Sequence, residues 1–224
     1  MQSVVLALGG SLIDLEDDTD FLKNLVSLFQ NVSKVYRLYV VVGGGKTARK
    51  YIGFGRQLGV DERRLDELGI SVTRLNALLV ASLMEEVNNV IPSTTSEAAA
   101  VDKPVVVMGG TTPGHSTDAV AAELAAKVSP ERFVIATDVD GVYDRDPKKH
   151  DDAKLFDEVT IEELERMCGS KWGKAGENVV VDGPALSIIK GLNCDVFVVN
   201  GRNLGNLENT LYGKGFVGTK IKKK

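Results

Sequence analysis

The sequence predicts an α/β fold with a parallel sheet, and two patterns along the chain support this prediction. Short β-branched apolar runs alternate with longer helix-like segments, which is typical of strands joined by crossover helices. The runs are almost continuously apolar, as expected of strands covered on both faces. The chain has 224 residues, 43% of them hydrophobic, which is enough for one sizeable core. We therefore expect a single domain over residues 1–224.

Five apolar runs are predicted strands, and three longer segments are predicted helices. The strands cover 4–8, 38–42, 105–108, 133–136 and 196–199. The helices cover 20–32, 62–87 and 118–128, with Asp20, Asp61 and Thr117 as capping residues. The third helix is rich in alanine, so we expect it to be buried. A softer boundary near Ser129-Pro130 gives approximate lobes of 1–129 and 130–224, and segment 138–152 is expected to be an exposed loop or hairpin.

Charge and cysteine content exclude several classes of protein. There are 27 Lys and Arg against 31 Asp and Glu, a net charge of -4, so no positive field is available to hold a nucleic-acid backbone. Cys168 and Cys194 are far apart, which favours reduced thiols over a disulfide framework or a thiolate metal site. No apolar run reaches the roughly 18 residues of a membrane span. No export signal is visible either, and we expect a cytoplasmic protein.

Glycine-rich loops follow each of the first three predicted strands. They are Gly9-Gly10-Ser11, Gly43-Gly44-Gly45-Lys46-Thr47 and Gly109-Gly110-Thr111-Thr112-Pro113-Gly114. Glycine lets an anion approach the backbone N–H groups closely, and a following helix N-terminus favours negative charge. Because the carboxyl ends of parallel strands meet at one edge of a sheet, we expect the three loops to form one ligand site. The alternative for any single loop is a tight turn without a ligand.

Other nucleotide-binding motifs fit less well. Gly45-Lys46-Thr47 resembles the end of a P-loop, but Val40 stands where that motif needs its first glycine. Gly43-x-Gly45-x-x-Ala48 satisfies the loose dinucleotide fingerprint, so a nucleotide-binding oxidoreductase remains an alternative. The two histidines have no metal-ligand spacing, and we name no metal ligand.

Several blocks of the sequence resemble the amino acid kinase family, and within it the archaeal-type uridylate kinases. The blocks are LGGS at 8–11, VGGGKTAR at 42–49, GI-x-x-TR-x-NA at 69–77, GTTPGHSTDA at 110–119 and TDVDGVY at 137–143. The resemblance extends over essentially the whole chain. It implies an αβα sandwich with a mainly parallel central sheet, a homohexamer, and transfer of the γ-phosphoryl group of ATP to UMP with Mg2+.

The resemblance also assigns residues to the two substrates. It places ATP on Gly9, Gly10, Gly45, Arg49, Thr137, Tyr143 and Asp146. It places UMP on Gly44, Asp66, Pro113, Gly114, His115, Ser116, Thr117, Asp118 and Ala119. On this basis 1–129 is a UMP-binding lobe and 130–224 an ATP-binding lobe. The hydroxyls of Ser116 and Thr117 at a helix start suit a dianionic monophosphate. Asp66 suits ribose hydroxyls, although a solvated helix-face carboxylate is an equal alternative.

Phosphoryl transfer needs positive charge around the transferred group more than it needs a covalent intermediate. The candidate cations are Lys46 and Arg49, one helical turn apart, and Lys174 in a glycine-rich segment. Asp118 resembles the family aspartate that organises the catalytic cations or the metal shell, with a dipole-favourable helix start as its alternative. Many amino acid kinases carry a lysine where this chain has Ala7, and the archaeal-type uridylate kinases resemble this chain in lacking it.

Alternatives to a UMP kinase remain open at this point. Within the family they are an isopentenyl-phosphate kinase or another small-acid kinase. A third alternative, from another class, is a non-catalytic storage module that binds nucleotides or oxyanions. Ala7 keeps it open, because this residue stands where a catalytic charge is expected.

Overall fold

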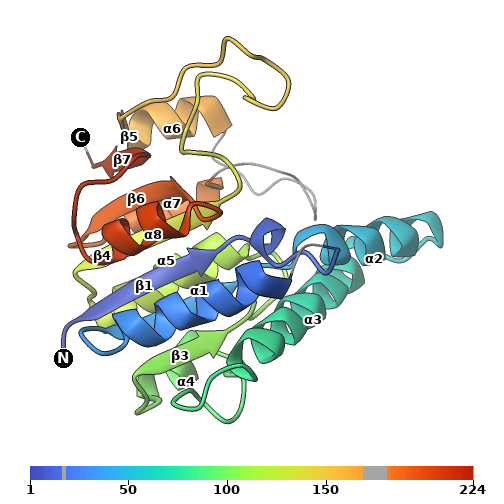
Figure 1. The fold of residues 1–224 in the computed structure, drawn as a ribbon. Helices are drawn as coiled ribbons and strands as arrows, with labels where there is room; N and C mark the ends of the chain where they lie inside the picture. Colours follow the sequence, from blue (N-terminus) through green and yellow to red (C-terminus); the bar gives the residue numbers. More distant parts are fainter. Residues whose placement is uncertain (17–18, 169–180, 224) are drawn as a thin grey trace.

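The computed structural model describes residues 1–16, 19–168 and 181–223, which form a seven-stranded sheet between two layers of helices (Figure 1). The strands are β1 (Ser3–Leu8), β2 (Arg37–Val42), β3 (Val105–Met108), β4 (Arg132–Thr137), β5 (Glu158–Thr160), β6 (Asp195–Asn200) and β7 (Thr219–Lys222). The helices are α1 (Thr19–Val32), α2 (Gly45–Gln57), α3 (Glu62–Ala81), α4 (Thr95–Ala100), α5 (Thr117–Val128), α6 (Ile161–Cys168), α7 (Gly183–Ile189) and α8 (Leu204–Leu211), with a 3-10 turn, η1, at Gly10–Leu12. This arrangement confirms the predicted αβα sandwich.

The sheet order is β3-β2-β1-β4-β6-β7-β5, and all pairs are parallel except β6 with β7. β1 lies between β2 and β4, with Ala7 opposite both Val41 and Ile135. The chain builds outward from β1 through β2 to β3 and then returns to place β4 on the other side of β1. Such a reversal leaves a crevice at the carboxyl ends of the strands, where ligands bind in open α/β sheets.

The strand residues alternate between two cores because successive side chains point to opposite faces of a sheet. One face packs on α4, α5, α6 and α7, and the other packs on α1, α3 and α8. Helix α5 contributes four consecutive buried residues, Ala119 to Ala122, which confirms the prediction that the Ala-rich helix is buried. Ala7 is buried in this same layer, opposite Ile135.

Helix boundaries differ from the predictions in three places. Asp20 lies inside the first turn of α1 and does not cap it. The N-cap of α5 is Ser116, whose hydroxyl oxygen accepts the N–H of Ala119, so the helix begins one residue earlier than predicted. Helix α3 ends at Ala81, six residues early, with Ser82 as its C-cap. The apolar residues beyond this point lie in a turn and an extended segment. The periodicity of apolar residues alone does not distinguish these from a continuing helix.

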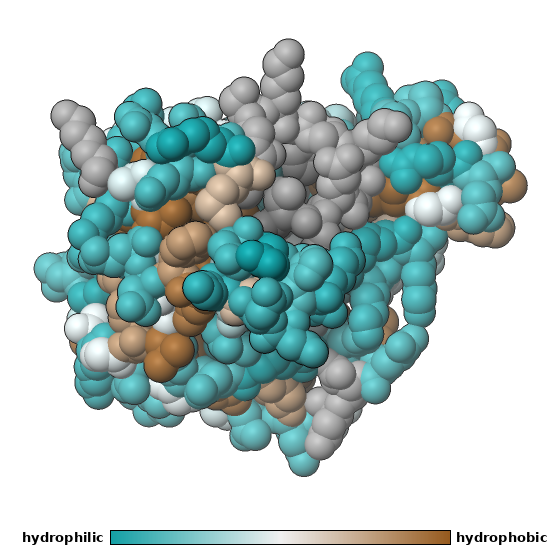
Figure 2. All heavy atoms as spheres, turned by 90° about the horizontal axis from the view of Figure 1, so that it is seen from above, coloured by the Kyte–Doolittle hydropathy of each residue, from teal (hydrophilic) through white to brown (hydrophobic). Residues whose placement is uncertain are grey.

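Helices α2 and α3 form a hairpin that projects beyond the sheet (Figure 1). Gly59, at a φ of 78°, makes the turn, and Asp61 caps α3 by accepting the N–H of Arg64, as predicted. Eight large apolar side chains are exposed on this hairpin and on the residues that end each helix: Tyr51, Phe54, Leu58, Leu68, Leu75, Leu78, Leu79 and Leu83. We call them the hairpin apolar surface, and Figure 2 shows apolar side chains at the projecting end. None of the helices in the described ranges is long and apolar enough to span a membrane.

Candidate active site

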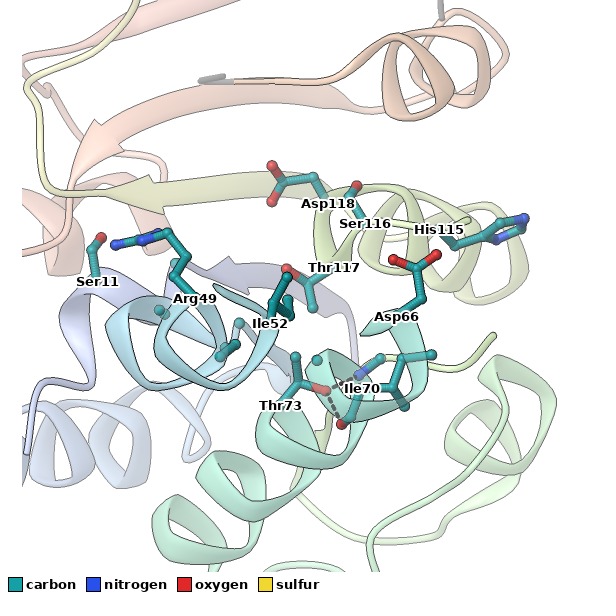
Figure 3. A pocket seen from close by; sticks show the side chains of 18 of the residues that line it. Ser11, Arg49, Ile52, Asp66, Ile70, Thr73, His115, Ser116, Thr117 and Asp118 are labelled. Atoms are coloured by element: carbon teal, nitrogen blue, oxygen red, sulfur yellow. Dashed lines mark hydrogen bonds between the residues drawn. The ribbon is translucent and has the colours of Figure 1, made fainter. Parts of the chain in front are cut away.

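A cavity of about 230 Å3 opens where the loops after β1, β2, β3 and β4 meet (Figure 3). All three glycine-rich loops line it, as do one face of α3 and the start of α5. The predicted site residues in its wall are Gly9, Gly10, Gly44, Gly45, Arg49, Asp66, Pro113, Gly114, His115, Ser116, Thr117, Asp118 and Thr137. The sheet topology therefore brings together segments from residue 9 to residue 138.

The first and second glycine loops touch each other through their backbones. A Cβ on Gly10 would overlap the amide nitrogen of Gly45, and a Cβ on Gly45 would overlap the carbonyl oxygen of Gly10. Gly45 also has a φ of 59°, which other residues rarely adopt. Glycine is therefore required at both positions, and the absence of side chains leaves the backbone N–H groups close to any ligand in the cavity.

Helix α2 points its N-terminus at the cavity and begins without a side-chain cap. Within the described residues, no hydrogen-bond acceptor faces the amides of Gly44 and Gly45. The exposed Arg49 guanidinium also has no ion pair or hydrogen bond in the part of the chain that the structure describes. Its side chain points to the side of the cavity formed by Ser11 (Figure 3). These groups give this end of the cavity a positive potential that suits a phosphate.

Hydrogen bonds hold the third loop over the opposite end of the cavity. Asp66 of α3 accepts the N–H of Gly114 at 2.8 Å, where the chain turns with a φ of 82°. This bond leaves the other carboxylate oxygen of Asp66 for a ligand. The imidazole Nδ1 of His115 lies 3.1 Å from a carboxylate oxygen of Glu123. Ser116 uses its oxygen lone pair to cap α5, and its O–H remains able to donate.

Asp118 is the most perturbed acid of the site. Burial, and secondarily the negative charge of Asp182, raise the pKa of its carboxyl to about 7. Asp182 is itself buried and accepts the N–H of Ala185 as the N-cap of α7. Asp118 therefore changes its charge near neutral pH, which is a common property of groups in functional sites.

The sequence was compared with models of known protein families and with known proteins. The sequence model of the amino acid kinase family matches residues 2–200. This chain belongs to the amino acid kinase family. The uridylate kinase of Thermoplasma volcanium is 45% identical over 100% of this chain and 99% of its own length. The uridylate kinase of Methanobrevibacter smithii is 39% identical over 97% and 98%.

Solved structures agree with this membership. The crystal structure of the uridylate kinase from Archaeoglobus fulgidus matches with a TM-score of 0.86 at 38% identity, covering 99% of this chain and 100% of that one. An isopentenyl phosphate kinase matches with a TM-score of 0.72 at 22% identity, and at that identity the likeness concerns the fold alone.

Not every predicted residue of this amino acid kinase lies in the cavity wall. Lys46 forms an ion pair with Asp14, whose carboxyl therefore has a lowered pKa. Ala119 has its side chain in the core. Tyr143 bonds to Asp140, and Asp146 accepts the N–H of Lys148, both outside the cavity lining. Lys174 lies outside the described residues.

Sequence reasoning missed two polar residues of the cavity wall, Thr73 and Asp138. Thr73 belongs to the GI-x-x-TR-x-NA block, which carried the resemblance without being given a role. Asp138 is bonded to Lys148 at 2.5 Å. Burial opposes the ionisation of Asp138, but the hydrogen bond and charge of Lys148 outweigh it and lower the pKa of this carboxyl. The pairing joins residues ten positions apart in an irregular loop, and no spacing rule anticipates it.

Proposed function

We propose that this chain is a UMP kinase, which transfers the γ-phosphoryl group of ATP to UMP and forms ADP and UDP in pyrimidine nucleotide biosynthesis. The observation that carries the proposal is that the Arg49 guanidinium and the amides of Gly44 and Gly45 have no partner among the described residues and lie at the meeting point of the three loops. The full-length likeness to proteins named uridylate kinase gives the acceptor.

In this proposal the two substrates meet over the second loop. UMP takes the side formed by Gly44, Asp66 and the loop 113–119, and the ATP phosphates take the side of Gly9, Gly10 and Gly45. The adjacent amides of Gly44 and Gly45 then lie on either side of the transferred group and hold it by hydrogen bonds. Positioning and charge stabilisation of this kind supply most of the catalysis in phosphoryl transfer.

Positive charge for the transferred phosphoryl group comes from Arg49, with Lys46 acting if its pairing with Asp14 is exchanged. Mg2+ in such sites is held by substrate phosphates and one or two carboxylates. The described residues contain no cluster of three His, Cys, Asp or Glu side chains for a metal, which fits an ion carried largely by ATP. Asp118 in the cavity wall is the carboxylate we assign to it. When bound, the ion neutralises phosphate charge.

The remaining site assignments belong to the same proposal. Thr137, Tyr143 and Asp146 serve the adenosine end of ATP, in the lobe 130–224, and the acceptor end belongs to the lobe 1–129. Tyr143 and Asp146 lie in the mostly exposed segment that follows β4, so we expect them to approach the nucleotide when ATP binds.

We further propose a homohexamer in the cytoplasm. The hairpin apolar surface supports self-association, because contiguous exposed apolar patches mark protein interfaces. Cys194, a free cysteine, is consistent with a reducing compartment.

A coupled assay of ADP release tests the function directly. The acceptors are UMP, CMP, dUMP, AMP, isopentenyl phosphate and N-acetylglutamate, each with ATP and Mg2+. We expect release with UMP, and much less with CMP and AMP. Release with isopentenyl phosphate but not with UMP would favour the other kinase. ATP binding without release for any acceptor would favour the storage module, and binding of a nicotinamide cofactor would favour the oxidoreductase.

A further inference from the structure

Helix α3 holds the second and third glycine loops together through side chains from a single turn. The hydroxyl oxygen of Thr73 accepts the N–H of Gly110 at 2.7 Å while its O–H bonds to Ile70 (Figure 3). Asn76, which is buried, donates to the carbonyl of Gly43 at 2.8 Å. Arg74 lies between them in the sequence. These residues form the TR-x-N part of a sequence block to which no role has yet been assigned.

Arg74 directs its guanidinium at backbone carbonyl groups. Its Nε donates to the carbonyl of Gly110 at 3.0 Å, and one terminal nitrogen donates to Thr111 at 3.2 Å and to Ser93 at 3.3 Å. It has no ion pair within the described ranges. A guanidinium presents several donors in a rigid plane, so it can fix consecutive peptide groups at once.

The direction of these carbonyls determines the direction of the neighbouring amides. In a trans peptide the C=O and the following N–H point in opposite directions. Because Arg74 binds the carbonyls of Gly110 and Thr111, the amides of Thr111 and Thr112 point away from its guanidinium. No acceptor for these two amides is found among the described residues. Gly110 and Thr112 both line the cavity.

We propose that Arg74 is a positioning residue for the acceptor substrate. It holds the third loop in the conformation that receives a phosphate monoester, and with Asn76 it sets the distance between this loop and the second one. The inference rests on the proposed function, because it takes the third loop as the acceptor side. Arg74 itself does not line the cavity, so it acts through the loop.

The test compares Arg74→Met and Arg74→Lys with Arg64→Met, a control on the same helix. Arg64 is 76% exposed and pairs only with Asp61 at 3.5 Å among its described contacts. For Arg74→Met we expect the KM for UMP to rise by about tenfold or more, with the KM for ATP unchanged. Arg74→Lys keeps the positive charge but loses the planar guanidinium group, so its KM for UMP should lie between those of the wild type and Arg74→Met. Equal KM values for UMP in the Met variant and the wild type, or an equal rise for both substrates, would overturn the inference.

A second readout does not depend on activity. Amide hydrogen exchange is measured for the peptides that contain 109–116 and 43–48. Loss of Arg74 should speed exchange in the first peptide, where Gly110 and Gly114 are protected, and leave the second unchanged. Unchanged exchange in 109–116 would refute the inference. If the wild type fails to phosphorylate UMP, the proposed function falls, and the exchange result still decides whether Arg74 holds the loop.

Discussion

Gly44 has no room for a side chain even though its backbone angles, φ −87° and ψ −26°, are open to any residue. A Cβ there would lie 2.5 Å from that of Ala48 and 3.4 Å from Thr73 Cγ2. The positive φ of this loop is at Gly45 instead. Steric exclusion at Gly44 therefore comes from the first turn of α2.

Gly44→Val should abolish phosphoryl transfer, because its branched side chain displaces the start of α2 and blocks the amides that hold the phosphoryl group. The measurement is kcat with UMP and ATP. Gly53→Ala is the matched control on α2, since nothing lies within 4 Å of its Cβ, and it should keep full activity. A folded Gly44→Val variant with nearly normal kcat would reduce the second loop to a structural turn.

Asp118→Asn separates catalysis from helix stabilisation. The substitution keeps the size of the side chain and removes the charge that we assign to the metal and the cations. Both kcat and kcat/KM should fall together, on the order of a hundredfold, with little change in UMP affinity. Steady-state kinetics and calorimetric UMP binding measure the two effects. Retention of kcat would remove Asp118 from the mechanism.

The raised pKa of Asp118 also predicts how stability depends on pH. Its carboxyl titrates near pH 7 in the folded chain and near 3.8 when unfolded, so the folded state binds the extra proton between these values. The stability contributed by the protonated form is present below about pH 4 and is lost as the pH rises through 7. Asp118→Asn should therefore gain stability relative to the wild type between pH 5 and pH 8, on the order of 1 kcal/mol or more. Melting curves in EDTA without nucleotide measure this, and a constant difference in Tm would contradict it.

The start of α5 offers a test of helix capping. Because Ser116 accepts the N–H of Ala119, Ser116→Ala should lower the free energy of unfolding by about 1 kcal/mol. Thr117→Ala, one residue inside the helix, should have a smaller effect. Urea unfolding of both variants makes the comparison. If Thr117→Ala loses more unfolding free energy than Ser116→Ala, Thr117 is the capping residue, as the sequence predicted.

The elements that the sequence predicted are those with long apolar runs. β1, β2, β4 and β6 extend one residue or fewer beyond each end of their predicted ranges, and β3 coincides with its range, because strands buried on both faces contain little else. β5 and β7 escaped prediction. They have three and four residues and include glutamate and lysine, and only β5 is an edge strand, so both carry too short an apolar signal.

The sequence predicts the parts of the candidate site that are formed by backbone groups. The three glycine loops are visible in the sequence because close approach requires glycine. Side-chain pairings are different: Lys46 with Asp14, 32 positions away, and Lys148 with Asp138 depend on how the loops fold back on one another. The bonds of Arg74 to the third loop, 36 and 37 positions away, are of the same kind.

Assembly of the whole molecule should depend on the hairpin apolar surface. Leu75→Glu combined with Leu79→Glu places charges on its α3 part, where the two leucines are 61% and 37% exposed. The wild type should sediment as a hexamer and the double variant as a smaller species. Val90→Glu is the control, since Val90 is 78% exposed and lies outside the hairpin. An unchanged mass for the double variant would exclude this surface from the assembly.

The central position of β1 has a consequence for how the chain is made. β1 pairs with β2 on one side and with β4 on the other, yet β4 begins roughly 120 residues after β1 ends. At ribosomal rates of about 5–20 residues per second, one edge of β1 stays open for roughly 6–25 s. An open apolar strand edge is a template for pairing with other chains. The arrival of residues 132–137 outside the ribosome therefore ends the period in which this edge of β1 can pair with another chain.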